Sequence, residues 1–260
     1  MINKITLTQK SYNLKIKKKV KNMGVGDIIG DALSYPFNNI QALVLFAILS
    51  IIAGLIGGAS LLSFATSFSS QGIGGFAFSG LGIVGIIILI LVIFLIEGYA
   101  LDIVKFGIER RADSPGIDFG RQVGNAIKLI IVTIVYYVIP AIIIFVLGLF
   151  LRDWILTIIS IILIIIFALA NFMAKCRLAK TDNLGDALAI GEAIGDISRV
   201  GFGKIIATVL VIFIFLVIVG FIIGLISNAN NTIGSILLGI FSVYFVFFYN
   251  RAIGLLYSEA

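Results

Sequence analysis

The chain has 260 residues, of which 60% are hydrophobic and 12% are charged, and its mean hydropathy is +1.19. Such a composition leaves too little polar surface to cover a water-soluble globule, so it excludes that class and predicts a membrane protein. The chain has no His and one Cys. The usual zinc sites, Ser-His-Asp hydrolysis and an intramolecular disulfide are therefore disfavoured or excluded.

Residues 1–22 are rich in lysine and contain no apolar run that could serve as a signal-peptide core. We expect a basic extension without fixed structure, followed by a single polytopic transmembrane domain over residues 23–260. The lysines either set topology alone or also hold anionic headgroups. A further alternative is that translation begins at Met23, which would make residues 1–22 dispensable.

Residues 25–34 place apolar side chains at helical spacing, with Asp27 and Asp31 four apart on another face. This pattern predicts a short helix lying at the membrane surface. We expect it to end at residues 34–36, because Pro36 disfavours helix at the preceding residue and fits the first turn of a new helix.

Six apolar runs then reach the length of about 20 residues that a helix needs to cross about 30 Å of hydrocarbon. They cover residues 40–62, 81–100, 127–150, 154–174, 205–227 and 233–253. The predicted fold class is an all-α membrane protein with about six transmembrane helices.

A polar entry segment, two spans and a polar exit occur three times along the chain. The first and third entries are similar, DIIGD at residues 27–31 and EAIGD at residues 192–196, and the second is VGN at residues 123–125. Each unit crosses the membrane twice, so all three would share one orientation. We predict three parallel two-helix hairpin repeats, with short interfacial helices on one side. The alternative is that these motifs are common to any helical hairpin.

All but one of the nineteen Lys and Arg residues, Arg152 being the exception, fall in the termini and alternate connectors that share one side. Positively charged connectors stay in the cytoplasm, which predicts a multi-pass cell-membrane protein with cytoplasmic N- and C-termini. The formal charge of +6 thus describes a membrane face. Because no basic folded module is present, we expect no nucleic-acid partner.

Ionisable residues are missing from most of the spans, which argues against a proton-coupled pump. The nearest polar residues are Glu97, Asn171 and Asn250, each near the same end of an even-numbered span. They could converge into a small polar cluster that binds a cation or gates a path. Alternatively, Glu97 extends to the interface and the two Asn residues bond neighbouring helices.

Pro140 lies near the middle of the third span, where it frees a backbone carbonyl and favours a kink. The Tyr136 hydroxyl or a water could satisfy that carbonyl. A kink beside Tyr136 and Tyr137 could shape a cavity, or it could simply fit neighbouring helices.

The fourth connector carries four carboxylates that could in principle hold Mg²⁺. Their Gly-interrupted spacing is more typical of solvated helix faces, so we predict no metal site; they are Asp182, Asp186, Glu192 and Asp196. Cys176 is expected to be a spectator. We predict no catalytic residue and no cofactor.

Several short motifs carry a resemblance to a known family: ALSYP at residues 32–36, GYAL at residues 98–101, Pro115 with Asp118, and Tyr136 and Tyr137 with Pro140. Over about residues 23–260 the chain resembles archaeal integral membrane proteins with the domain of unknown function 4013. The resemblance implies an archaeal cytoplasmic membrane and the same multi-helix domain. It implies no activity.

Three function classes follow. We favour a non-enzymatic membrane scaffold or accessory subunit, whose partners are membrane lipids and either other membrane proteins or further copies of the chain. The alternative is a transporter or permease for a small neutral or lipid-like molecule, with a cavity near Tyr136, Tyr137 and Pro140. An enzyme would need convergent acid, base or metal groups, which the spans lack.

Overall fold

A computed structural model describes the backbone of residues 23–71 and 80–260, and the side chains of residues 23–57 and 83–260. Within those ranges it contains helices and no strands. The helices are α2 (Val25–Asn38), α3 (Ile40–Gln71), α4 (Gly80–Ile108), α5 (Phe119–Gly148), α6 (Asp153–Thr181), α7 (Leu184–Ala187), α8 (Ile190–Val200), α9 (Phe202–Ala229) and α10 (Asn231–Tyr257).

Six of these helices, α3, α4, α5, α6, α9 and α10, are long and apolar enough to cross a membrane. The predicted all-α membrane fold is therefore confirmed. The basic extension predicted over residues 1–22 lies outside the described residues.

The surface helix α2 continues beyond the end that Pro36 predicted. Pro36 lies in its last turn, and the helix ends only at Asn38. Proline lacks one N–H, but the backbone N–H of Asn39 bonds the carbonyls of Tyr35 and Pro36 and completes the turn. Only Asn39 separates α2 from α3, so the two helices meet at a sharp corner.

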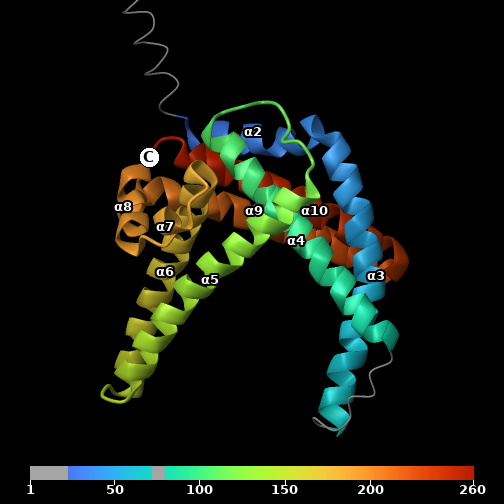
Figure 1. The fold of residues 1–260 in the computed structure, drawn as a ribbon, viewed down its shortest axis with the longest axis horizontal. Helices are drawn as coiled ribbons and strands as arrows, with labels where there is room; N and C mark the ends of the chain where they lie inside the picture. The colour runs from blue at the N-terminus through green and yellow to red at the C-terminus, as the bar shows by residue number, and fades with distance from the viewer. Residues whose placement is uncertain (1–22, 72–79) are drawn as a thin grey trace, which may run out of the picture.

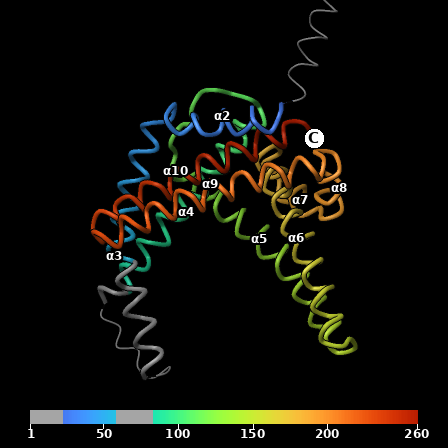
Figure 2. The backbone as a smooth tube through the Cα atoms, turned by 180° about the vertical axis from the view of Figure 1, so that it is seen from behind, coloured from blue at the N-terminus to red at the C-terminus, as the bar shows by residue number. Residues whose placement is uncertain are grey.

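The six long helices form the hairpins α3/α4, α5/α6 and α9/α10. Figures 1 and 2 show that α3/α4 and α5/α6 lean away from one another below α2, while α10 crosses α4 and α3. Close backbone approach supports that crossing, because a Cβ on Gly239 would lie 2.7 Å from Cγ1 of Ile51. The hydroxyls of Ser50 and Ser242 are 3.5 Å apart across the same contact.

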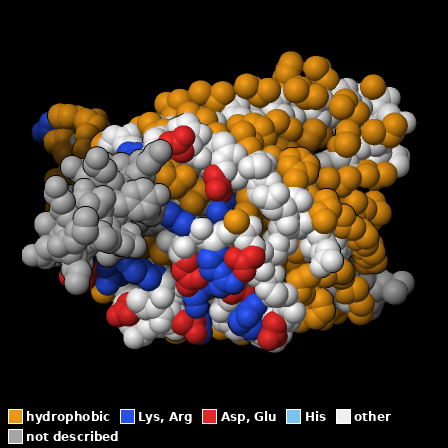
Figure 3. Space-filling view, turned by 90° about the horizontal axis from the view of Figure 1, so that it is seen from above, with side chains coloured by type: hydrophobic (Ala, Val, Ile, Leu, Met, Phe, Trp, Pro, Cys, Tyr) orange, Lys and Arg blue, Asp and Glu red, His pale blue; other side chains and the backbone are white. Residues whose placement is uncertain are grey.

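The best-packed part of the molecule is the end that carries α2, residues 109–118, α7, α8 and the C-terminus, here called the charged end. Its core includes completely buried side chains such as Tyr99, Ile103, Met173 and Phe248. Seen from above, Lys, Arg, Asp and Glu side chains gather on this surface beside a large apolar area (Figure 3). In contrast, residues 141–166, here called the exposed hairpin, contain no buried side chain.

Polar links at the charged end join the three hairpins in a closed order. The segment that begins each hairpin bonds the second helix of the preceding hairpin. In the same way, α2 at the start of the first hairpin bonds α10, the second helix of the last. The links are Arg251 Nε to Asp31 at 2.7 Å, Asn125 Nδ2 to Asp102 at 3.2 Å and Arg177 Nη1 to Asp196 at 3.1 Å. Three related hairpins would be linked in such an order, but the repeat itself stays a prediction.

Buried tyrosines fix the loops of the charged end. The Tyr35 hydroxyl donates to the carbonyl of Asp113, and the Tyr99 hydroxyl donates to the carbonyl of Pro115. Burial raises the pKa of the Tyr35 hydroxyl, so that group stays protonated and remains a donor. These bonds hold residues 109–118 against the ends of α2 and α4.

Candidate functional site

A groove of about 380 Å³ lies where five spanning helices meet near the charged end. We call it the five-helix groove. Its lining comes from α4 (Glu97), α5 (Leu129, Thr133, Tyr137), α6 (Ala168, Leu169, Asn171, Phe172, Lys175), α9 (Val209) and α10 (Tyr249, Ile253). Lining residues on one helix recur at three- and four-residue spacing, so each helix presents a single face to the groove.

An ion pair crosses this groove. Lys175 Nζ of α6 lies 3.4 Å from Glu97 Oε2 of α4, and the two side chains are 17% and 44% exposed. Charged groups within spanning helices are expensive to bury, so they are normally paired and tend to mark functional positions. Glu97 thus has a partner on another helix, while the alternative that it extends to the interface stays open because its side chain is 44% exposed.

Four other polar side chains in the groove have no hydrogen-bond partner among the described residues. They are the Thr133, Tyr137 and Tyr249 hydroxyls and the Asn171 amide. Polar groups inside a membrane protein usually find an internal partner, because hydrocarbon offers none. The groove thus holds unused hydrogen-bonding capacity beside an ion pair.

The predicted polar cluster is only partly assembled. Glu97 and Asn171 both line the five-helix groove, but Asn250 does not. The Asn250 side chain donates to the carbonyl of Val246 in its own helix at 2.7 Å, and its Oδ1 atom is buried without a partner. Neither Asn171 nor Asn250 bonds a neighbouring helix among the described residues.

The three residues expected to shape a cavity do not lie in one site. Tyr137 lines the groove, whereas Tyr136 is completely buried and donates its hydroxyl to the carbonyl of Ala187 at 2.9 Å. The Tyr136 hydroxyl is thus not committed to the carbonyl that Pro140 frees. Pro140 is buried inside the continuous helix α5 and does not line the groove.

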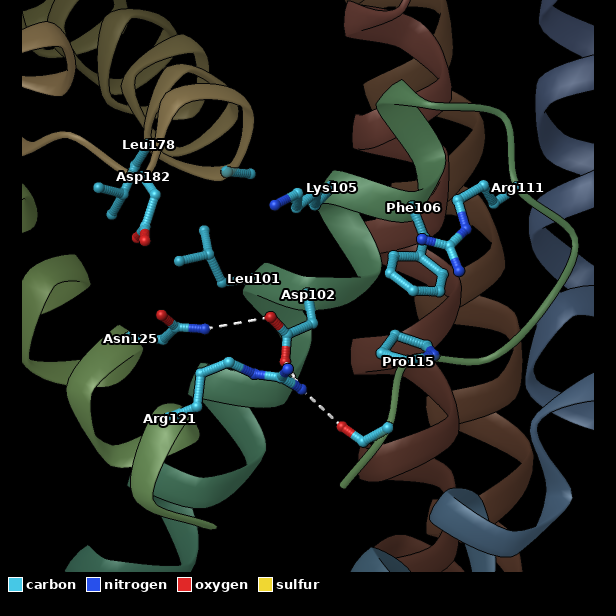
Figure 4. Close-up of a pocket in the computed structure, with 12 residues that line it drawn as sticks. Leu101, Asp102, Lys105, Phe106, Arg111, Pro115, Arg121, Asn125, Leu178 and Asp182 are labelled. Atoms are coloured by element: carbon cyan, nitrogen blue, oxygen red, sulfur yellow. Dashed lines mark hydrogen bonds and ion pairs between the residues drawn. The ribbon is translucent and has the colours of Figure 1, made fainter. Parts of the chain in front are cut away.

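A second pocket, of about 310 Å³, lies beneath residues 109–118 (Figure 4). Asp102 is at its centre, held by the Asn125 amide and by Arg121, whose other bond goes to the carbonyl of Gly116 at 2.6 Å. Asp102 therefore pairs with Arg121 and Asn125 of α5. Most charged groups here already have protein partners, which is typical of a structural joint.

The carboxylates of the fourth connector are not all solvated, contrary to the prediction. Asp196 is 1% exposed and accepts from Arg177, Arg199 and the Tyr257 hydroxyl. The Glu192 carboxylate raises the pKa of Arg199 through a hydrogen bond. Among the described residues, no three His, Cys, Asp or Glu side chains form a group that could hold a metal ion.

Sequence reasoning missed three of the polar residues that line the groove, Lys175, Thr133 and Tyr249. Lys175 was assigned to the basic connector, yet it follows Asn171 by four residues and so shares its helix face. Thr133 stands in the same relation to Tyr137. That spacing was the available signal.

A family model described as a protein of unknown function (DUF4013) matches residues 81–228, which is more than half of the chain. The match includes the motifs at residues 98–101 and around Pro115, Tyr136 and Pro140, but not residues 32–36. The expected archaeal source stays a prediction. No curated protein and no solved structure matches. The chain belongs to the DUF4013 family.

Proposed function

We propose that this member of the family is a non-enzymatic membrane scaffold or accessory subunit that contacts the helices of other membrane proteins. The observation that carries the proposal is the exposed hairpin. Residues 141–166 contain no buried side chain, and Phe145 and Phe150 are 71% and 81% exposed.

Transmembrane helices associate through close packing and polar contacts between them, because lipid is as apolar as their side chains. The rest of the described chain buries no side chain of the exposed hairpin, while the charged end has a core of fully buried side chains. A molecule with one closely packed end and one helix pair whose side chains are not buried is suited to hold a neighbouring protein in the bilayer.

The same proposal places the charged end in the cytoplasm, since its connectors carry nearly all of the Lys and Arg residues. Partnered carboxylates support a role without chemistry of its own. Asp182 pairs with Lys128, Glu192 with Arg199, and Asp196 with three donors. Groups so neutralised are poorly placed to bind a metal or abstract a proton.

Photo-crosslinking in native membranes tests the proposal. A benzophenone amino acid replaces Phe145 or Ile158 on the exposed hairpin, and Leu55 of α3, which is 65% exposed, serves as the matched control. We expect a protein adduct of defined mass at the first two positions and lipid adducts alone at Leu55. Lipid adducts alone at all three positions would refute a partner on this hairpin.

The transporter alternative is favoured by one observation, the five-helix groove with Glu97, Asn171 and Tyr137 in its wall. Flux of small neutral solutes in proteoliposomes, with the native chain and with Glu97→Gln, tests it. Flux that exceeds empty vesicles and falls in the variant would support transport over the scaffold role.

A further inference from the structure

We propose that the five-helix groove binds one zwitterionic phospholipid, with its phosphate on Lys175 and its protonated amine on Glu97. This inference goes beyond the scaffold role and does not rest on it, because a lipid in the groove needs no protein on the exposed hairpin.

The charges of the groove select such a headgroup. Lys175 and Glu97 are 3.4 Å apart, so the groove is neutral as a whole but has one positive and one negative pole. A purely anionic headgroup would face repulsion from Glu97, and a purely cationic one would face repulsion from Lys175. A headgroup with both charges can bond each pole with a charge-assisted hydrogen bond.

The depth of Lys175 suits a headgroup. Lys175 precedes the end of α6 at Thr181 by six residues, which is about 9 Å at 1.5 Å per residue. A lysine usually extends its ammonium toward water from such a depth, but this side chain is only 17% exposed. It is held within the groove, where a lipid phosphate can reach it from the membrane side.

The rest of the lining matches the remainder of a lipid. Leu169, Phe172 and Val209 offer an apolar wall for acyl chains. The Asn171 amide and the Thr133 hydroxyl, both unpartnered among the described residues, can bond the phosphate and the glycerol linkage oxygens. The pocket beneath residues 109–118 is less suited to a lipid headgroup, because most of its charged groups already pair with other residues of the chain.

Native mass spectrometry of the full-length chain tests the proposal. The purified protein is delipidated in mild detergent and titrated with phosphatidylethanolamine, which carries phosphate and amine, or phosphatidylglycerol, which carries phosphate alone. We expect one tightly bound phosphatidylethanolamine. Lys175→Met should weaken it by about tenfold or more, the effect of one lost charge-assisted bond. Glu97→Gln should abolish the preference over phosphatidylglycerol.

The control is Lys180→Met, which removes a cation from the same helix outside the groove and should bind as the native chain does. Asn171→Leu keeps the ion pair, so it tests the groove even where charge variants fold poorly; it should weaken binding several-fold. Equal binding of the two lipids by the native chain would overturn the proposal. Unchanged binding in both Lys175→Met and Asn171→Leu would also overturn it. The ion pair would then only connect α4 and α6.

Discussion

The helices α5 and α6 run from the charged end into the exposed hairpin, and their surroundings differ between the two regions. At the charged end, α5 and α6 meet α4, α7, α8 and α10 through buried tyrosines, ion pairs and close glycine contacts. Further along the same two helices, residues 141–166 contain no buried side chain. The comparison shows that a helix long and apolar enough to cross a membrane can be closely packed at one end and exposed along the rest of its length.

The largest effect is expected from a substitution that disrupts the close backbone contact between α4 and α5 at the charged end. A Cβ on Gly98 would lie 1.8 Å from the carbonyl oxygen of Gln122, and backbone cannot move aside cheaply. We expect Gly98→Ala to prevent α4 and α5 from docking, which size-exclusion chromatography in detergent would show as loss of the monodisperse protein.

The matched variant in the exposed hairpin is Gly148→Ala. Its Cβ would meet only the flexible end of Leu156, at 3.3 Å. We expect a normal elution profile. Equal tolerance of both variants would contradict the close α4–α5 contact.

A smaller effect follows from removing a buried carboxylate. Asp196→Ala leaves Arg177, whose side chain is 17% exposed, without its buried partner. Breaking a buried pair in this way costs about 3–5 kcal/mol, so we expect a much lower thermal midpoint. Asp153→Ala, at the start of α6 in the exposed hairpin, should cost less than about 1 kcal/mol through the helix dipole. Similar midpoints in the two variants would refute the comparison.

Adjacent tyrosines give a finer test. Tyr136→Phe leaves the carbonyl of Ala187 without its buried donor, which should cost about 1–3 kcal/mol. Tyr137→Phe removes a hydroxyl with no protein partner among the described residues, so we expect the free energy of unfolding to change by about 0.5 kcal/mol or less. Denaturant titration of both variants checks this, and a larger loss in Tyr137→Phe would reverse the assignment.

The smallest effect depends on pH. The Arg111 guanidinium, through its hydrogen bonds, lowers the pKa of Asp113 below its ordinary value of 3.8. A carboxyl with a depressed folded-state pKa contributes stability above its unfolded pKa and loses it as the pH falls through the folded one. We expect Asp113→Asn to be slightly less stable than the native chain at pH 7, and the difference to vanish only under strongly acidic conditions. A difference that vanishes between pH 7 and pH 5 would rule Asp113 out as its cause.

Much of the fold could be predicted from the sequence, because hydropathy alone marks the lipid-embedded parts. The third span was expected over residues 127–150 and the helix is Phe119–Gly148. Its first eight residues are polar or mixed, so they carry no hydropathy signal, although the N-cap at Asp118 was available to find the start. At Pro36 the sequence predicted a helix end that does not exist. The last turn of a helix can lack one backbone N–H and still form, so α2 continues to Asn38.

The site was less predictable, since it depends on how each helix is rotated about its axis. Polarity within the spans identified Glu97 and Asn171. Asn250 does not line the groove, and the Tyr136 hydroxyl bonds the carbonyl of Ala187 in α7 and does not line a cavity. Both outcomes follow from packing between helices distant in the sequence. Neither local pattern nor composition contains that information.

The link from Arg251 to Asp31 has a consequence for biosynthesis. It joins α10, the last described helix, to α2, the first described helix. The Glu259 carboxylate also accepts a hydrogen bond from the backbone N–H of Met23. During translation, α2 and α3 therefore emerge long before their closing partners exist. The bonds between α2 and the segment after residue 250 can form only once that segment has been synthesised, so α2 must reach the membrane before its partners in this contact.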